Sequence, residues 1–175
     1  MKAMLRKLAR PKSSRTVVAR RDLPRTLGDA ARARRDWESA ARHYALHLED
    51  HPADFPIWVQ FGHALKESGQ LERAEIAYSQ ALRLNGYCAD LWLNRGHLSK
   101  LRGDLRAARA RYARSHALDR NGAASAELKT LQAATAPAGI AFNDDIGDGL
   151  ADEPAGDNTK PIRALDVYNG TFLNL

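Results

Sequence analysis

The side chains best suited to chemistry in this 175-residue chain recur at a spacing of 34 positions. Each of two sets holds an amide, a histidine and a lysine: Gln60, His63 and Lys66, then Asn94, His97 and Lys100. An amide both donates and accepts hydrogen bonds, so the two amides could hold the main chain of a peptide without reading its sequence. The alternative is that these side chains are merely solvated positions on helix surfaces.

The histidines raise a second kind of chemistry, metal binding. Asp29 stands where His63 and His97 stand in the later sets, so three ligand types could face one side of the protein. Neighbouring helices lie roughly 8–10 Å apart, which is wide for side chains on different helices to share a zinc ion. We therefore expect surface or groove histidines and no metal.

Motifs of other catalytic chemistry are missing from the sequence. We find no glycine-rich phosphate loop, nucleophile elbow, cysteine cluster or His-Glu metal motif. The single cysteine, Cys88, excludes an internal disulfide and fits a reducing compartment. We expect no cofactor and no enzyme activity from this chain by itself.

The two sets of polar residues belong to a longer repeated pattern. The stretch WVQFGHALKESGQLERAEIAYSQAL begins at Trp58, and WLNRGHLSKLRGDLRAARARYARSH begins 34 positions later at Trp92. A third copy precedes them. The apolar positions of each copy follow helical spacing in two blocks, so each copy is predicted to be a helical hairpin. The matched positions are Gly28, Gly62 and Gly96; Gly69 and Gly103; Ala40, Ala74 and Ala108; and Tyr44, Tyr78 and Tyr112.

The repeated small and large residues indicate how each hairpin packs. Gly62 and Ala74 suit places where two helix backbones approach closely, because a larger side chain would hold the helices apart. Trp58 and Tyr78 supply the bulk that fills the space beside them. The sequence therefore predicts a Tyr78 ring wedged against Gly62 and the next hairpin.

This pattern resembles the tetratricopeptide repeat, which reads W-x2-L-G-x2-Y, then A-x3-F, then P at a 34-residue period. The resemblance covers about residues 21–121, and the middle copy fits best. Polar residues at apolar positions of the third copy predict a looser unit there. The departures are Pro24 and Ala31 in the first copy, and Arg95, Ser99 and Ser115 in the third.

The resemblance implies an all-α fold, a right-handed α-solenoid of three helical hairpins plus a capping helix, with flexible tails. The segment AASAELKTLQAAT supplies the cap, a helix over residues 123–135, within a repeat domain of residues 22–136. In this family the first helix of each hairpin lines a concave groove that holds a partner peptide. The resemblance therefore implies that the two amide, histidine and lysine sets bind the partner.

One variant of the family binds chaperones, and the sequence argues against it. Its members clamp a terminal carboxylate with lysines, asparagines and an arginine on successive first helices. At the corresponding positions this chain has Arg25, Asp29, Gln60, Asp90 and Asn94. Two acids stand where the clamp needs neutral or basic donors, so we do not expect that function.

Residues 1–21 are predicted to form a basic flexible arm. A solvated terminus, contact with an acidic partner or an anionic membrane surface, and an organellar targeting peptide all fit its composition. Nucleic acid is not expected, since no aromatic residue is interleaved among the charges. The arm holds no acid and eight bases: Lys2, Arg6, Lys7, Arg10, Lys12, Arg15, Arg20 and Arg21.

The C-terminal part of the chain differs from the repeats. Residues 137–160 read as an acidic linker; DDIGDGLADEPA resembles a calcium loop but has Ile146 and Ala155 where ligands are required. In residues 161–175, apolar and polar residues alternate around Asn169-Gly170, which predicts a β-hairpin. Such a hairpin would be the start of a truncated domain.

Two functions stay open at this point. The first is a protein–protein interaction module or adaptor that binds a partner peptide on its concave face. The second is the N-terminal targeting module of a larger, truncated enzyme such as a bacterial cell-surface glycosyltransferase. No window approaches the ~18 apolar residues of a membrane span, so we expect a cytoplasmic protein, membrane-peripheral if the arm contacts lipid.

Overall fold

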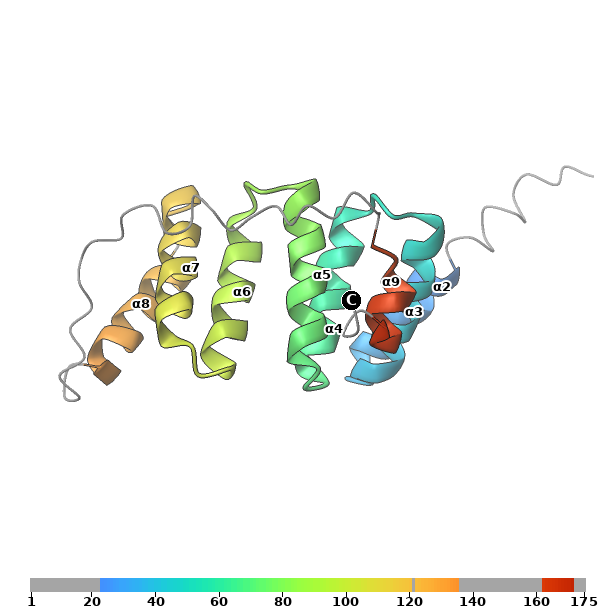
Figure 1. Ribbon diagram of the computed structural model, residues 1–175, viewed down its shortest axis with the longest axis horizontal. Coiled ribbons are helices and arrows are strands. Elements are labelled where there is room, and N and C mark those ends of the chain that lie inside the picture. Colours follow the sequence, from blue (N-terminus) through green and yellow to red (C-terminus); the bar gives the residue numbers. More distant parts are fainter. Residues whose placement is uncertain (1–22, 121, 136–161, 172–175) are drawn as a thin grey trace, which may run out of the picture.

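The computed structural model describes residues 23–120, 122–135 and 162–171, and every regular element in these ranges is a helix. Figure 1 shows the helices following one another along the molecule from α2 to α8, while α9 lies back at the first end. The helices are α2 (Leu23–Ala33), α3 (Trp37–Asp50), α4 (Phe55–Glu67), α5 (Leu71–Leu84), α6 (Ala89–Leu101), α7 (Leu105–Leu118), α8 (Gly122–Thr135) and α9 (Ala164–Asn169).

The repeated part is a right-handed α-solenoid. Helices α2 and α3, α4 and α5, and α6 and α7 pair as three hairpins, and α8 packs against α7 at the end of the stack. The predicted all-α class, the three hairpins and the capping helix are confirmed. The cap begins one residue earlier than expected, at Gly122.

The predicted contact between a glycine and a tyrosine is present in all three hairpins. The three tyrosine rings are fully buried, and each occupies the space that a side chain at the glycine would need. Glycine therefore permits the close approach of the two helices. A Cβ placed on the glycine would lie 2.6 Å from the ring for Gly28 and Tyr44, 2.6 Å for Gly62 and Tyr78, and 2.3 Å for Gly96 and Tyr112.

The turn inside each hairpin uses one left-handed residue. Gly69 and Gly103 both have φ of 79°, and Arg35 takes the same place in the first hairpin with φ of 59°. This conformation costs a non-glycine residue roughly 1–2 kcal/mol, because its Cβ approaches the following carbonyl oxygen. The first hairpin therefore carries a local strain that the other two avoid.

Aspartates begin three of the helices. Asp36, Asp54 and Asp104 each accept a hydrogen bond from the backbone N–H three residues later, at 3.2, 3.3 and 2.9 Å. These bonds satisfy donors that the first turn of a helix leaves without partners. Each aspartate therefore fixes the start of α3, α4 or α7.

The β-hairpin predicted at the C-terminus is wrong for the residues that the structure describes. Ala164–Asn169 form helix α9, and Gly170 ends it in the left-handed conformation with φ of 75°. The Asn-Gly pair thus serves as a helix C-cap and not as a hairpin turn. The buried residues Ala164 and Val167 are three positions apart, which is helical spacing.

Several predictions fall on residues outside the described ranges. These are the basic arm of residues 1–21, the acidic linker of residues 137–160 and the last four residues of the expected hairpin. None of the described helices combines the length and apolar character that a bilayer crossing needs.

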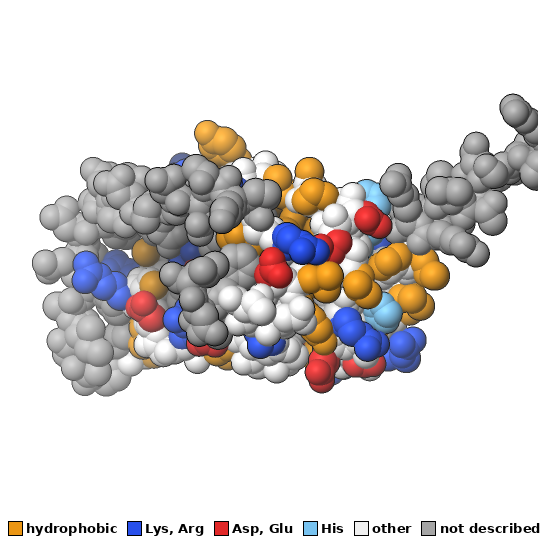
Figure 2. All heavy atoms as spheres, turned by 45° about the vertical axis from the view of Figure 1, so that its right-hand side comes forward, with side chains coloured by type: hydrophobic (Ala, Val, Ile, Leu, Met, Phe, Trp, Pro, Cys, Tyr) orange, Lys and Arg blue, Asp and Glu red, His pale blue; other side chains and the backbone are white. Residues whose placement is uncertain are grey.

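The first hairpin presents an apolar end. Leu23, Leu27 and Leu46 are 50%, 42% and 42% exposed, and Figure 2 shows hydrophobic side chains gathered toward this end of the molecule. Among the described residues, no earlier hairpin is present to pack against α2. The stack therefore ends in partly uncovered leucines at one side and in α8 at the other.

Candidate functional site

The predicted site is a row of six side chains, here called the α4–α6 stripe. It consists of Gln60, His63 and Lys66 from α4, and Asn94, His97 and Lys100 from α6. None of them is fully buried. The structure therefore leaves the whole stripe within reach of a partner, although its two halves have different surroundings.

The histidine of the second hairpin is held by the first hairpin. The rings of His63 and Trp37 meet edge to face, with centroids 5.6 Å apart and planes at 69°. The Nδ1 atom of His63 is buried and has no hydrogen-bond partner in the described part of the chain. Burial, together with the charge of Lys66, lowers the pKa of His63 below its ordinary value. The neutral ring is therefore favoured at pH 7.

The histidine of the third hairpin is held by its own hairpin and by the cap. Nδ1 of His97 lies 3.1 Å from the Tyr112 hydroxyl and 3.9 Å from Oε1 of Glu127. Burial lowers the pKa of His97, and the carboxylate of Glu127 opposes that shift. Nζ of Lys100 donates to Oε2 of Glu127 at 2.9 Å. The cap thus brings its own carboxylate to this half of the stripe.

The two amides differ in how much of their hydrogen-bonding capacity is free. Asn94 donates one N–H to the carbonyl oxygen of Asp90 at 2.9 Å, so its Oδ1 and second N–H are left for a partner. The Gln60 side chain has no hydrogen bond within the described residues. Gln60 is therefore the more available of the two.

A third cation continues the lysine positions, and the sequence interpretation missed it. Arg32 lies 34 residues before Lys66, at the end of α2, and is exposed. Its charge contributes to the lowered pKa of His63. Lys66 affects both His63 and His97, so it lies electrostatically between the two halves of the stripe. The 34-residue spacing was the signal that could have revealed Arg32.

A buried charge network lies between the second and third hairpins, and the sequence interpretation also missed it. Arg95 is 2% exposed and donates from Nε to Oε1 of Glu75 at 3.1 Å. Arg111 donates to the same Oε1 at 2.9 Å and to Oγ of Ser99 at 2.6 Å. Arg95 and Ser99, two of the polar residues that break the repeat pattern, thus belong to one network with Glu75 and Arg111. The buried Oγ of Ser115 has no hydrogen-bond partner among the described residues.

The possibility of a metal shared by Asp29, His63 and His97 finds no support in the described residues. Oδ1 of Asp29 accepts a hydrogen bond from the Tyr44 hydroxyl at 2.8 Å. Within the described ranges, no group of three histidine, cysteine, aspartate or glutamate side chains is placed to hold a metal ion. The three equivalent positions instead contact three different partners.

Comparison with protein families agrees with this geometry. The sequence profile of the tetratricopeptide repeat matches residues 55–88, which cover α4 and α5. The same glycine and tyrosine contact recurs in the hairpins before and after that match. The chain thus carries a tetratricopeptide repeat at residues 55–88. A search of curated protein sequences finds no significant match to it.

Several solved structures share its fold. The first repeat domain of Spaghetti (RPAP3), bound to the HSP90 peptide SRMEEVD, is 20% identical with a TM-score of 0.61, over 66% of this chain and 93% of that one. The type III secretion chaperone SycD of Yersinia enterocolitica, in complex with a peptide of the translocator YopD, is 15% identical with a TM-score of 0.61, over 72% and 99%.

A third similar structure is the MamA protein, which is 19% identical with a TM-score of 0.59. The match covers 66% of this chain and 63% of that one, so the chain spans less than two thirds of the length of MamA. At these identities the likeness shows the fold alone. A tetratricopeptide repeat solenoid supports a role as a protein–protein interaction module.

Proposed function

We propose that this tetratricopeptide repeat protein is an adaptor that binds an extended partner peptide along the α4–α6 stripe. The observation that carries the proposal is the recurrence of an amide, a histidine and a lysine on successive first helices, all at least partly exposed. The peptides held by the similar structures of SycD and Spaghetti support a peptide as the class of partner.

The two amides are the proposed contacts to the peptide main chain. Gln60 and Asn94 lie one repeat apart, and both retain an acceptor oxygen and at least one donor. Each hydrogen bond to a main chain contributes about 0.5–1.5 kcal/mol net, because it replaces bonds to water. Two such contacts fix the path of the peptide without selecting its side chains.

The cations are the proposed source of selectivity. Arg32, Lys66 and Lys100 recur at the ends of α2, α4 and α6, which favours a partner with acidic side chains. Lys100 already meets the carboxylate of Glu127, and a partner carboxylate would take over that contact. The partner proposed here is therefore an acidic segment in extended conformation.

The proposal does not include a terminal carboxylate clamp of the chaperone-binding kind. Asp29 is engaged by the Tyr44 hydroxyl, and Asp90 carries a second negative charge at a clamp position. Both acids would repel a terminal carboxylate. The basic arm of residues 1–21 is kept as a separate proposed contact, to an acidic partner or an anionic membrane surface, in a cytoplasmic protein.

The proposal is tested by capturing a partner and then measuring its affinity. A photo-crosslinking residue at position 60 identifies the captured peptide, and calorimetric titration compares the wild type with the Gln60→Ala/Asn94→Ala double variant. We expect a loss of about 1–3 kcal/mol, or roughly 5- to 150-fold in Kd, at an unchanged Tm.

A matched control is available on the second helix of the middle hairpin. Gln80→Ala removes an amide of similar exposure from α5, outside the stripe, and should leave the affinity unchanged. Equal affinities of the wild type and the double variant would exclude the stripe as the binding site.

A further inference from the structure

Helix α9 occupies a place on the second helices of the first two hairpins, away from the α4–α6 stripe. It packs against α3 and α5, and Figure 1 shows it lying in front of α3. Ala164 and Val167 are 1% and 0% exposed. Ile162, Leu165 and Tyr168 add partly buried surface to the same core cluster. A segment remote in sequence thus completes the core at the first end of the solenoid.

Polar contacts fix the direction of α9 on the surface of α3 and α5 that it covers, here called the seat. One carboxylate, Glu49 of α3, accepts from Nε of Arg163 at 2.9 Å and from the backbone N–H of Leu165 at 3.1 Å. At the other end, a Cβ on Gly170 would lie 2.5 Å from the guanidinium of Arg73. The seat therefore recognises an arginine, the first turn of a helix and a closely packed glycine end.

The polar contact of the seat is specific to the first hairpin. Glu49 of α3 accepts from both Arg163 and the backbone N–H of Leu165. The residue 34 positions later is Arg83, which cannot accept a hydrogen bond and would repel an arginine. The recognition of α9 is thus a property of this sequence and not of the repeat fold in general.

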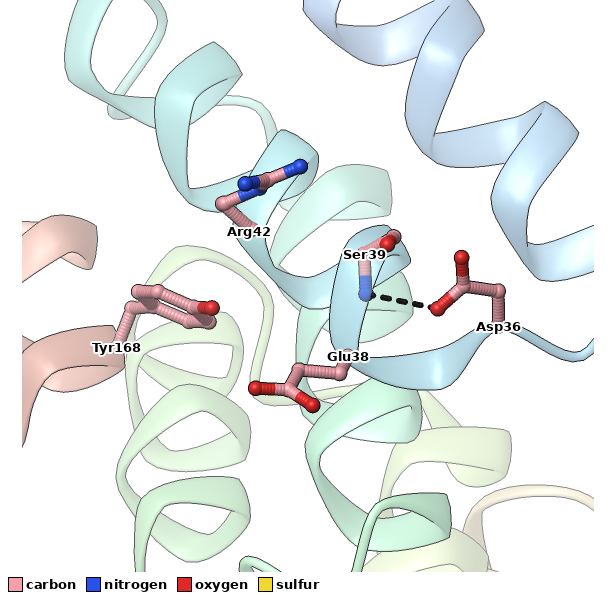
Figure 3. Close-up of a pocket in the computed structure, with 5 residues that line it drawn as sticks. All are labelled: Asp36, Glu38, Ser39, Arg42 and Tyr168. Carbon is pink, nitrogen blue, oxygen red and sulfur yellow. Dashed lines mark hydrogen bonds between the residues drawn. The ribbon is translucent and has the colours of Figure 1, made fainter.

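The edge of the seat is incompletely filled. Figure 3 shows Tyr168 of α9 facing residues at the start of α3 across a hollow. The hollow measures about 140 Å³ and is polar in its lining. Space beside the aromatic ring leaves room for a different or larger side chain from another segment. The lining residues are Asp36, Glu38, Ser39, Arg42 and Tyr168.

We propose that the surface of α3 and α5 beneath α9 is a second docking site, and that α9 is its tethered and exchangeable occupant. The partner that fits it is a short helix of another protein chain with the chemistry of α9: an arginine, then small and aliphatic residues at helical spacing, then an aromatic. A six-residue helix is not stable in water by itself, so α9 takes its structure from the seat.

Because α9 belongs to the same chain as the seat, it competes with any added peptide and weakens the binding of that peptide. A tethered segment competes at an effective concentration on the order of millimolar. A helical peptide that binds the free seat with a Kd of about 100 μM is therefore weakened about tenfold by α9. Loosening α9 in the full chain should remove that penalty, and this is the measurable sign of an exchangeable occupant.

The test uses a fluorescent peptide of residues 162–171 and the full-length protein, followed by anisotropy. Arg163→Glu loosens α9 by placing a like charge beside Glu49, and Val167→Glu does so by placing a charge in the buried contact. Lys129→Glu, on exposed α8, is the control with the same change in charge. We expect binding at least fivefold tighter to the two α9 variants than to the wild type and the control.

A second step shows where the peptide binds. Adding Glu49→Gln to the Arg163→Glu chain should abolish the tighter binding, whereas adding Gln60→Ala/Asn94→Ala should leave it unchanged. Arg163→Glu adds no buried charge, because the Arg163 side chain is 63% exposed, so it decides the test if Val167→Glu unfolds the protein.

Other results of the same titrations would contradict the exchange of α9. Equal titrations for the wild type, Arg163→Glu and Lys129→Glu, or the lack of any binding up to about 1 mM, would show that α9 is a fixed part of the fold. Retention of the tighter binding in the Glu49→Gln chain would also refute this seat. A wild-type mass that rises with protein concentration supports exchange, with a second copy of the chain as the donor.

Discussion

The two interfaces between successive hairpins occupy the same repeat positions and are built from opposite chemistry. On α4, Phe61 and Leu65 are fully buried. On α6, the residues at the same places are Arg95 and Ser99, each only 2% exposed. The comparison teaches that the repeat pattern defines the hairpin, through its glycine and tyrosine contact, but leaves open how one hairpin is joined to the next.

Among the described residues, the carboxylate of Glu75 joins the two arginines of the second interface. Glu75 accepts from both Arg95 and Arg111, and the guanidinium of Arg95 also lies 5.5 Å from the centre of the Trp92 ring. Burying charges costs several kcal/mol per ion before their attraction is counted, so such a network is a poor source of net stability. The network is nevertheless sensitive to substitution, because removing one charged side chain leaves the others buried without an opposite charge.

The largest effect is therefore expected from Glu75→Gln. The variant removes the shared carboxylate from beside two guanidinium groups and should lower the free energy of unfolding by about 3 kcal/mol. Glu72→Gln on the exposed side of α5 is the control and should change it by less than about 0.5 kcal/mol. Urea unfolding followed by circular dichroism measures both. Similar midpoints for the two variants would mean that the network does not stabilise the interface.

Converting the second interface into the first sharpens the comparison. The change Glu75→Ala/Arg95→Phe/Ser99→Leu/Arg111→Ala installs the apolar residues that stand at the equivalent places of α3, α4 and α5. Replacing a buried ion network by apolar packing is neutral or stabilising by about 1–4 kcal/mol, so the quadruple variant should be at least as stable as the wild type. A quadruple variant less stable than Glu75→Gln would show that the charges fit this interface better than apolar packing does.

The sequence predicts the contacts that form within one hairpin. Gly62 and Tyr78 meet across a single turn, so their spacing alone specifies the contact. The surroundings of the stripe were not predictable in the same way, because Trp37 and Glu127 reach His63 and His97 from other hairpins or the cap. Those contacts depend on how hairpins stack, which no local pattern encodes.

The misinterpreted C-terminus has the same cause. A segment as short as α9 shows both alternation and helical spacing, and Asn169-Gly170 suits a hairpin turn and a helix end equally well. What decides between them is the seat on α3, where Glu49 holds the first turn of the helix. Tertiary contact, and not local preference, selects the helix.

A smaller effect is expected from acidification, and it acts through the two histidines of the α4–α6 stripe. Burial lowers the pKa of His63 and His97 in the folded protein relative to the unfolded chain. Their contribution to stability is therefore complete above the ordinary histidine pKa of about 6.5 and is lost as pH falls toward the lowered values. The Tm should decrease between about pH 7 and pH 5.

The variant His63→Gln should make the Tm depend less steeply on pH, because it removes one of the two titrating rings. In the wild type the His63 ring packs on Trp37 at the junction of the first two hairpins. His51→Gln is a control on α3, since that ring stacks on His47 away from the stripe. A His63→Gln protein whose Tm falls with pH as steeply as that of the wild type would exclude His63 as a source of the dependence.

The smallest expected effect concerns a turn that the first hairpin alone builds without glycine. Arg35→Gly relieves a strain of roughly 1–2 kcal/mol at φ of 59°, but it also gives the unfolded chain more freedom, which costs about 0.5–1 kcal/mol. The difference should be a gain of about 0.5 kcal/mol in the free energy of unfolding. The reverse change, Gly69→Arg in the second hairpin, should lower the free energy of unfolding by a comparable amount. Gly69 has φ of 79° and nothing lies within 4 Å of a Cβ added there, so the strain is purely in the backbone. If thermal unfolding shows both changes to be destabilising, the side chain of Arg35 contributes contacts that outweigh its backbone strain, and the two turns are not equivalent.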